Sequence, residues 1–178
     1  MYILPSEASE AEFRELLSYW QSKLPPGRLP GRQHIDPTEL QPRHLSQLLL
    51  LDVLDVAAPK LRRRYRFRVA GTGFSAIAGR DVTGLHYDEI GAPERILPVI
   101  RALDLIVECR APVYLSGRLS IPSQDHIWVK RLGLPLAQDG DRVDMILCIW
   151  LAERRSVADV ARGDPGREAG TPQVLERA

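Results

Sequence analysis

The amino-acid sequence predicts an α+β fold, in which a five-stranded antiparallel sheet has helices on one face and an N-terminal helix on the other. Two segments with the residue pattern of β-strands precede a helical middle region, and three more follow it. The last of them, Val143–Trp150, is apolar at both alternating sets of positions, so both faces of its strand need cover. Two amphipathic helices, one N-terminal and one central, can supply that cover.

The N-terminal helix has a predicted start and a defined apolar face. Ser9 followed by Glu12 matches a capping box, which places the first turn there. The apolar face packs on its own domain in one interpretation and pairs with a second copy of the chain in the other. With the second, we expect a homodimer. The stripe consists of Phe13, Leu16, Leu17, Trp20 and Leu24, of which the first four are the dimer-interface candidates.

A connector and the first pair of strands follow. Proline and glycine residues at positions 25–31 end the helix, and Asp36 before Pro37 is placed to cap a short helical turn. Leu48–Val56 is rich in Leu and Val and apolar at both parities at its start, which favours a central strand. The basic cluster after Pro59 indicates a hairpin that leads into the next strand.

Arginines alternate with apolar residues along that next strand. Arg64, Arg66 and Arg68 are predicted to face water, while Tyr65, Phe67 and Val69 turn inward. A solvated or protected sheet edge explains this pattern, and contact with an anion such as nucleic acid is the alternative.

The helical middle region begins with glycines. Gly71 is expected to take a positive φ after the strand, and Gly79 to close a short apolar helix. A longer helix is predicted over Ala92–Arg110, with Pro93 in its first turn and Pro98 as an irregularity. Its apolar face consists of Ile96, Val99, Ile100, Leu103, Ile106 and Val107.

Three strands complete the sheet, at Val113–Leu119, Ile127–Leu136 and Val143–Trp150, with a hairpin signal at Asp139-Gly140. Beyond Ser156 the sequence is polar and weakly periodic, which indicates a mobile tail with a brief helix after Arg154. The predicted organisation is therefore a helix and connector at 1–36, a domain at 37–155 and a flexible tail at 156–178.

Composition narrows the class of protein. The 178 residues include 44% hydrophobic ones, and 24 Lys and Arg balance 23 Asp and Glu, so no basic excess points to nucleic acid. The N-terminus lacks a signal-peptide pattern and no apolar run is long enough to cross a bilayer, so we expect a cytoplasmic protein without membrane contact. Cys109 and Cys148 are isolated and are expected to be buried free thiols.

Catalytic and metal-binding constellations are missing from the sequence. The four histidines, at 34, 44, 86 and 126, have no spacing that places two on one helical face. Gly71-Thr72-Gly73 lacks the third glycine of a dinucleotide-binding loop, and Asp52 and Asp55 point to opposite faces of a strand. We therefore expect neither an enzyme nor a metal site.

The predicted order of strands and helices resembles that of a PAS domain, specifically of a bacterial subfamily of single-domain proteins whose ligands are mostly unknown. The resemblance is carried by YRFRVAGTGFSAIAGRDVTG at 65–84 and RLGLPLAQDGDRVDMIL at 131–147, with Trp20, HIDP at 34–37 and LLLLDV at 48–53 upstream. It implies a PAS-like five-stranded sheet, a cavity under the long helix, no chemistry of its own and a signalling role.

The resemblance also disfavours two cofactors. Flavin-binding photoreceptors of this family carry a reactive cysteine on the short helices, where this chain reads FSAIAGRDVTG without one. Haem-binding members commonly use a histidine on the long helix, and Ala92–Arg110 contains none, which leaves only His86 or His126. The expected cofactor is therefore none or unknown.

A cavity between sheet and helix can be outlined by strand and helix parity. Two functions are open: a module that responds to a small molecule and acts on a partner such as a sensor kinase, or a protein-binding or dimerising adaptor with a filled core. The candidate cavity residues are Phe67, Val69, Thr72, Phe74, Ile77, Leu103, Val107, Tyr114, Leu115, Arg131, Met145 and Leu147.

Overall fold

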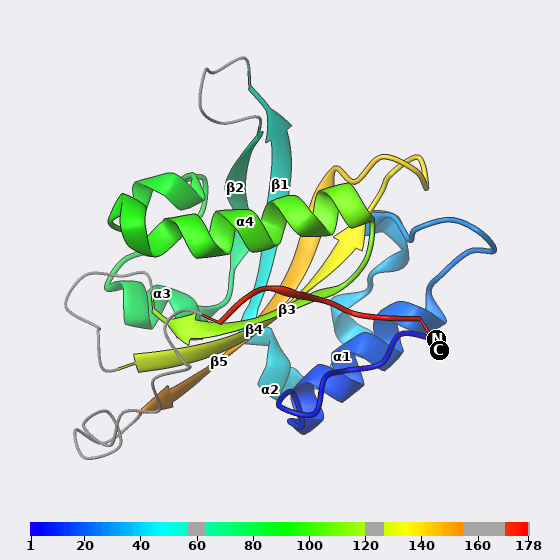
Figure 1. Ribbon diagram of the computed structural model, residues 1–178, viewed down its shortest axis with the longest axis horizontal. Helices are drawn as coiled ribbons and strands as arrows, with labels where there is room; N and C mark the ends of the chain where they lie inside the picture. The colour runs from blue at the N-terminus through cyan, green and yellow to red at the C-terminus, as the bar shows by residue number, and fades with distance from the viewer. Residues whose placement is uncertain (57–62, 120–126, 155–169, 178) are drawn as a thin grey trace.

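The computed structural model describes residues 1–56, 63–119, 127–154 and 170–177, and shows one antiparallel sheet with helices packed on it (Figure 1). The predicted α+β class with an antiparallel sheet is confirmed, but the sheet has six strands in the order β2-β1-β5-β4-β3-β6. The strands are β1 (Leu48–Asp55), β2 (Arg63–Ala70), β3 (Val113–Arg118), β4 (Ile127–Leu136), β5 (Met145–Arg154) and β6 (Gln173–Val174). The α-helices are α1 (Ala11–Ser22), α2 (Pro42–Leu45), α3 (Thr72–Ala78) and α4 (Pro93–Cys109), with short 3-10 turns η1 (Arg32–His34), η2 (Pro37–Glu39) and η3 (Tyr87–Glu89).

The sixth strand comes from the segment that the sequence predicted as a flexible tail. β6 pairs with β3, and the Leu175 N–H donates to the Pro112 carbonyl at 2.8 Å. Leu175 is 5% exposed and belongs to the core, so the prediction of a mobile tail is wrong for residues 170–177. Residues 155–169, which include the brief helix expected after Arg154, lie outside the described residues.

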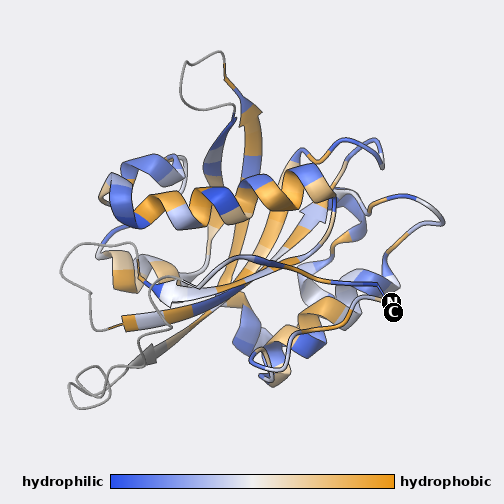
Figure 2. Ribbon diagram, viewed as in Figure 1, coloured by the Kyte–Doolittle hydropathy of each residue, from blue (hydrophilic) through white to orange (hydrophobic). Residues whose placement is uncertain are grey.

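The two faces of the sheet are covered by different helices. α4 lies across one face, with its apolar side turned toward the strands (Figure 2). α1 covers the opposite face, because the Phe13 ring meets the Tyr114 ring at 5.8 Å and Trp20 Nε1 donates to the Pro135 carbonyl at 2.9 Å. The buried parities of β5 therefore face α4 and α1, as the sequence required.

The stripe on α1 is part of this core. Phe13, Leu16 and Trp20 are fully buried, and Leu17 is 4% exposed. The assignment of these four residues to a dimer interface is therefore wrong, since none of the four has apolar surface left for a second chain. The start of α1 also differs from the prediction: Glu10 is the N-cap without a side-chain hydrogen bond, so Ser9 and Glu12 form no capping box.

A β-bulge changes the direction of side chains in β2. Leu50 is opposite Val69 and Leu51 is opposite Phe67, so Arg68 is an extra residue in the ladder. Tyr65 and Phe67 point inward as predicted, but Val69 beyond the bulge is 51% exposed. The parity argument failed there because one inserted residue reverses every later position.

The arginines of β2 protect an edge strand. Arg66 and Arg68 both form ion pairs with Asp52, at 2.7 and 3.3 Å, and Arg64 pairs with Asp88 at 3.0 Å. These internal partners support the interpretation of a protected sheet edge over one of contact with a nucleic acid.

Glycines at the ends of α3 have two different roles. Gly71 has φ −61°, so the expected positive φ is wrong; instead, a Cβ there would lie 2.4 Å from the Ser46 carbonyl oxygen. Only glycine allows α2 and α3 to approach this closely. Gly79 does take φ +70° and ends the helix, as predicted.

α4 carries the second face of the core. It runs through Pro98 and ends where Arg110 takes φ 52°, the one positive φ at a non-glycine position within the described ranges. In the same ranges, no helix is both long and apolar enough to cross a membrane.

The packing of the C-terminal segment can be tested with two neighbouring residues. Leu175→Ala is expected to lower the free energy of unfolding by about 2–3 kcal/mol, because it removes buried methyl groups. Val174→Ala, at a side chain that is 37% exposed, is the control and should change it by less than about 1 kcal/mol. Urea unfolding measures both, and equal effects would contradict the packed position of Leu175.

Candidate ligand-binding site

The candidate site lies between α4 and the sheet face that α4 covers. Side chains from β1, β3, β4, β5 and α4 enclose a small internal cavity of about 30 Å³. Gly133 sits in its wall, where a Cβ would lie 2.4 Å from Ile106 Cδ1, so the glycine lets α4 approach β4 closely. The residues that line the cavity include Tyr87, Leu103, Leu115, Arg131, Cys148 and Trp150.

Some of the predicted cavity residues meet at this place and others do not. Phe67, Phe74, Leu103, Leu115 and Arg131 are buried on the α4 side of the sheet, in the cavity wall or in the ring contacts beside it. Ile77 and Val107 are partly buried and pack against the core without lining the cavity.

The remaining predicted residues are wrong for this cavity. Thr72 and Val69 are exposed. Tyr114, Met145 and Leu147 belong to the opposite face: Tyr114 contacts α1, and the register places Met145 and Leu147 opposite Leu136 and Leu134. The prediction assigned the odd-numbered side chains of β5 to the face that α4 covers. In the structure the even-numbered side chains of Cys148 and Trp150 line the cavity on that face.

Sequence reasoning missed Tyr87, Cys148 and Trp150 as cavity residues. Cys148 and Trp150 belong to the second set of alternating apolar positions in β5, so the sequence pattern contained them. Trp150 lies opposite Arg131 of β4 in the sheet, and Cys148 lies opposite Gly133. Tyr87 lies in η3, a short turn that has no periodic signal in the sequence.

Aromatic rings connect the cavity to α3. Phe67 contacts Phe74 at 5.5 Å and stacks on Tyr87 at 5.0 Å between ring centroids. Phe74 in turn meets the Trp150 ring edge-on at 5.5 Å. These contacts fix the position of the Trp150 indole beside the cavity.

A charged side chain lies in this apolar environment without a counter-charge. Arg131 is 8% exposed, and its Nη2 atom is buried with no hydrogen-bond partner. Its neighbour across the ladder, Trp150, has a buried Nε1 that is also without a partner. In the described part of the chain, no Asp or Glu forms an ion pair with Arg131. Buried donors left unsatisfied are rare in folded proteins, which marks this pair as a place for an acceptor.

Two groups that interact with the guanidinium are neutral at ordinary pH. Burial raises the pKa of the Tyr87 phenol, and the charge of Arg131 and its hydrogen bond to the phenol only partly oppose the rise. Burial also raises the pKa of the Cys148 thiol to about 12, again against the influence of Arg131. Neither group therefore supplies the negative charge that a buried guanidinium requires.

A groove leads from this position to the surface. It has a volume of about 290 Å³ and runs between the first turns of α4 and the end of β3, with Arg131 in its wall. Val99 and Leu115 line both the groove and the internal cavity. Among the described residues that line it, the arginines Arg95, Arg118 and Arg131 outnumber the one carboxylate, Glu94. A small acid could enter with its body in the groove and its acidic group at Arg131.

Within the described ranges, no three His, Cys, Asp or Glu side chains lie close enough together to hold a metal ion. The two unpartnered polar atoms of the site, Arg131 Nη2 and Trp150 Nε1, are both hydrogen-bond donors, which suits an anion.

Comparison with protein families finds a match to a model described as PAS domain, over residues 8–151. The match covers most of the chain, from the segment just before α1 to β5, and so includes both helices that cover the sheet. A comparison with curated proteins finds no match.

The unpaired charge of Arg131 predicts a stability effect. Arg131→Met is expected to raise the free energy of unfolding of the ligand-free protein by about 1 kcal/mol or more, because an apolar side chain replaces a buried cation. Arg101→Met, on the exposed side of α4, should change it by less than about 0.5 kcal/mol. A clear destabilisation by Arg131→Met in urea would mean that the charge is already satisfied.

The raised pKa of Cys148 predicts selective alkylation. Since only the thiolate reacts, iodoacetamide at pH 8 should modify the exposed Cys109 and leave the buried Cys148 intact in the folded protein. Peptide mass spectrometry reads out both sites, and rapid modification of Cys148 at pH 8 would contradict the prediction.

The raised pKa of Cys148 also makes the stability of the fold depend on pH. The Cys148 pKa rises from 9.0 to about 12 on folding, so the unfolded chain loses this proton first. This contribution to stability is intact below pH 9 and is lost as the pH rises toward 12.

Proposed function

Because the chain belongs to the PAS domain family, we propose that it is a sensory and regulatory module that binds a small organic acid between α4 and the sheet. PAS domains are generally non-catalytic sensory modules. The proposal adds a site and a ligand class to that general role.

The single observation that carries the proposal is the pair of buried, unpartnered donors at Arg131 Nη2 and Trp150 Nε1. A carboxylate has two oxygens and about four lone-pair positions, so one group can accept from both donors. In an apolar environment such charge-assisted hydrogen bonds are stronger than the same bonds in water. Binding would therefore relieve a cost that the free protein carries.

The shape of the site limits the size of the ligand. The internal cavity of about 30 Å³ holds roughly one water molecule, whereas the groove of about 290 Å³ is near the lower end of small-molecule sites. The ligand is accordingly a small acid whose carboxylate enters the cavity while its body stays in the groove, against Val99 and Leu115.

Signalling follows from the position of the ligand between two layers. α4 packs on β3 and β4, and both α4 and β3 contribute residues to the groove, so an occupied site would change the packing of α4 on the sheet. A ligand shifts such an equilibrium only by its difference in affinity for the two arrangements. We propose that the partner is a signalling protein, such as a sensor kinase, that binds one of these two arrangements of α4 on the sheet.

A second function has an observation in its favour. The small internal cavity is what a filled core leaves, which supports a protein-binding or homodimerising adaptor without a small-molecule ligand. In that case the surface other than the α1 stripe would make the contacts, because that stripe is buried.

The test is a titration of the purified protein with small monocarboxylates of increasing chain length, alongside the matching uncharged amides. Binding should raise the melting temperature and shift the indole N–H NMR signal of Trp150. The indole of Trp20 already donates to Pro135, so its signal is the internal control and should stay in place. Arg131→Met should weaken binding about tenfold or more.

Two results would overturn the ligand proposal. One is that no acid of the series changes the Trp150 signal or the melting temperature while the protein carries no small molecule by native mass spectrometry, a result that favours the adaptor. The other is that acids and amides bind equally well, because the guanidinium would then have no role.

A further inference from the structure

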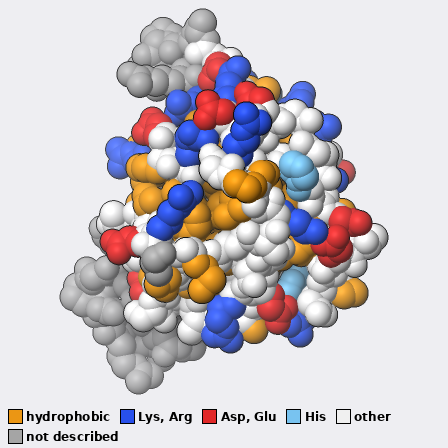
Figure 3. Space-filling model, turned by 90° about the vertical axis from the view of Figure 1, so that its right-hand side faces the viewer, with side chains coloured by type: hydrophobic (Ala, Val, Ile, Leu, Met, Phe, Trp, Pro, Cys, Tyr) orange, Lys and Arg blue, Asp and Glu red, His pale blue; other side chains and the backbone are white. Residues whose placement is uncertain are grey.

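A second, larger cleft lies away from the site between α4 and the sheet. It has a volume of about 600 Å³ and is formed where the end of α1, the connector after it, the end of α4 and the two terminal segments meet. Figure 3 looks onto this end of the molecule and shows an apolar hollow with Lys and Arg side chains at its edge. This volume lies within the usual range for sites of small molecules.

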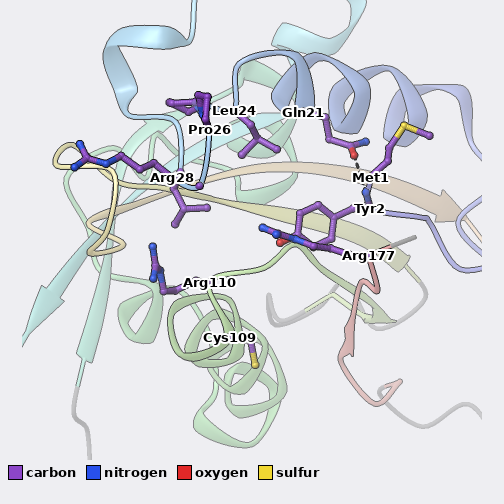
Figure 4. Close-up of a pocket in the computed structure, with 12 residues that line it drawn as sticks. Met1, Tyr2, Gln21, Leu24, Pro26, Arg28, Cys109, Arg110 and Arg177 are labelled. Atoms are coloured by element: carbon purple, nitrogen blue, oxygen red, sulfur yellow. Dashed lines mark hydrogen bonds between the residues drawn. The ribbon is translucent and has the colours of Figure 1, made fainter.

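Part of the cleft wall is apolar or aromatic. Leu24 and Pro26 lie across the cleft from the ring of Tyr2 (Figure 4), and Pro25 and Leu29 also line it. No Asp or Glu is among the residues that line it, while three of the lining residues are arginines. The cleft therefore combines an apolar surface with an excess of positive charge.

The three arginines come from three separate parts of the chain. Arg28 lies in the connector, Arg110 directly follows α4, and Arg177 is at the C-terminal end of the described chain. Figure 4 shows Arg110 and Arg177 reaching toward the space beneath the connector. Residues so far apart in sequence meet here only through the fold.

The charges of these arginines are largely available to a ligand. Among the described residues, none forms an ion pair with Arg28. Arg177 lies over the Tyr2 ring at 5.1 Å, a contact that uses the face of its guanidinium rather than the N–H donors. Arg110 has one carboxylate partner, Asp141, at 2.8 Å, and that aspartate is 80% exposed. An exposed pair of this kind contributes little and exchanges readily for another anion.

The backbone at Arg110 supports a role for its side chain. A residue in this position after a helix is usually glycine or asparagine, because a left-handed φ is costly for other residues. Arg110 takes φ 52° all the same. An arginine that breaks a local rule at the edge of a cleft is a candidate for function rather than for stability.

The cleft is held together before any ligand binds. The Tyr2 N–H donates to Gln21 Oε1 at 2.6 Å, as Figure 4 shows, and the Tyr2 ring packs on Trp20 at 5.7 Å. On the other side, the Leu29 N–H donates to the Gly140 carbonyl at 2.9 Å. A cleft whose frame is already formed loses less entropy on binding.

We propose that this cleft binds a small organic anion with an apolar or aromatic body, whose acidic group contacts Arg110 and Arg177, the two arginines that reach into the cleft. The apolar body would rest on the connector and the Tyr2 ring. The cleft is a hollow bounded by five segments rather than an extended groove, so it fits a compact molecule better than a peptide. The site is independent of Arg131 and needs no assumption about the ligand there.

The experiment is a titration of the protein with naphthalene-2-carboxylate, in which binding is measured by calorimetry and by NMR of the backbone amides. The cation 2-naphthylmethylammonium has a similar shape and the opposite charge, and serves as the matched probe. The carboxylate should bind and shift the amides of Tyr2, Arg28 and Arg110, and the cation should bind at least tenfold more weakly. Equal binding of the two probes would overturn the proposal.

Variants identify the residues. Arg177→Ala and Arg110→Gly should each weaken binding of the carboxylate about tenfold, whereas Arg101→Ala on α4 should leave it unchanged. Arg110→Gly also relieves the left-handed backbone, so a loss of binding without a lower melting temperature separates function from folding.

Two further variants complete the test. Asp141→Asn frees Arg110 from its internal partner and should tighten binding by a few fold. Arg131→Met should leave the amide shifts at Tyr2 and Arg28 intact, which separates this cleft from the site under α4. If the Arg177 and Arg110 variants bind as the unchanged protein does, the cleft is not the anion site.

Discussion

The structure depends on one constraint: strand β5 lies in the middle of a sheet and is apolar on both faces, so both faces must be kept from water. α4 covers one face and α1 the other, and each does so with a stripe of side chains that leaves almost no apolar surface over. Because the hydrophobic effect is the main driving force of folding, the position of the two helices follows from this strand. The candidate site, the cleft and the burial of the α1 stripe are all results of the same arrangement.

This constraint was visible in the sequence, and so was most of the fold. The two apolar parities of 143–150, the stripe on α1 and the glycine that ends α3 each have a local physical reason and were predicted correctly. The misses have local reasons too. A single bulge at Arg68 reversed Val69, and Gly71 serves a close approach to Ser46 that no local pattern reveals. β6 is two residues long and is stabilised by β3 and by the burial of Leu175, which are tertiary effects.

The site was harder to predict than the fold because it depends on which face of each strand α4 covers. Parity divides the side chains of β5 into two sets, but it does not say which set meets α4. Arg131 was the best guide: an arginine on a strand that is otherwise nearly all buried needs a reason. In the fold it faces the cavity with Trp150, and their donors lack acceptors. Such a pair reduces the stability of the free protein, and proteins retain such features mainly where they serve binding or regulation.

The two ends of the described chain support each other. The Ile3 N–H donates to the Glu176 carbonyl at 3.1 Å, and Tyr2 forms a bridge with Arg177, so neither segment has a full set of partners without the other (Figure 1). Fraying of one end therefore exposes the backbone of the other, and the two should open as a single cooperative unit. Since Tyr2 and Arg177 both line the large cleft, local opening at the ends would dismantle one of its walls while the sheet stays folded.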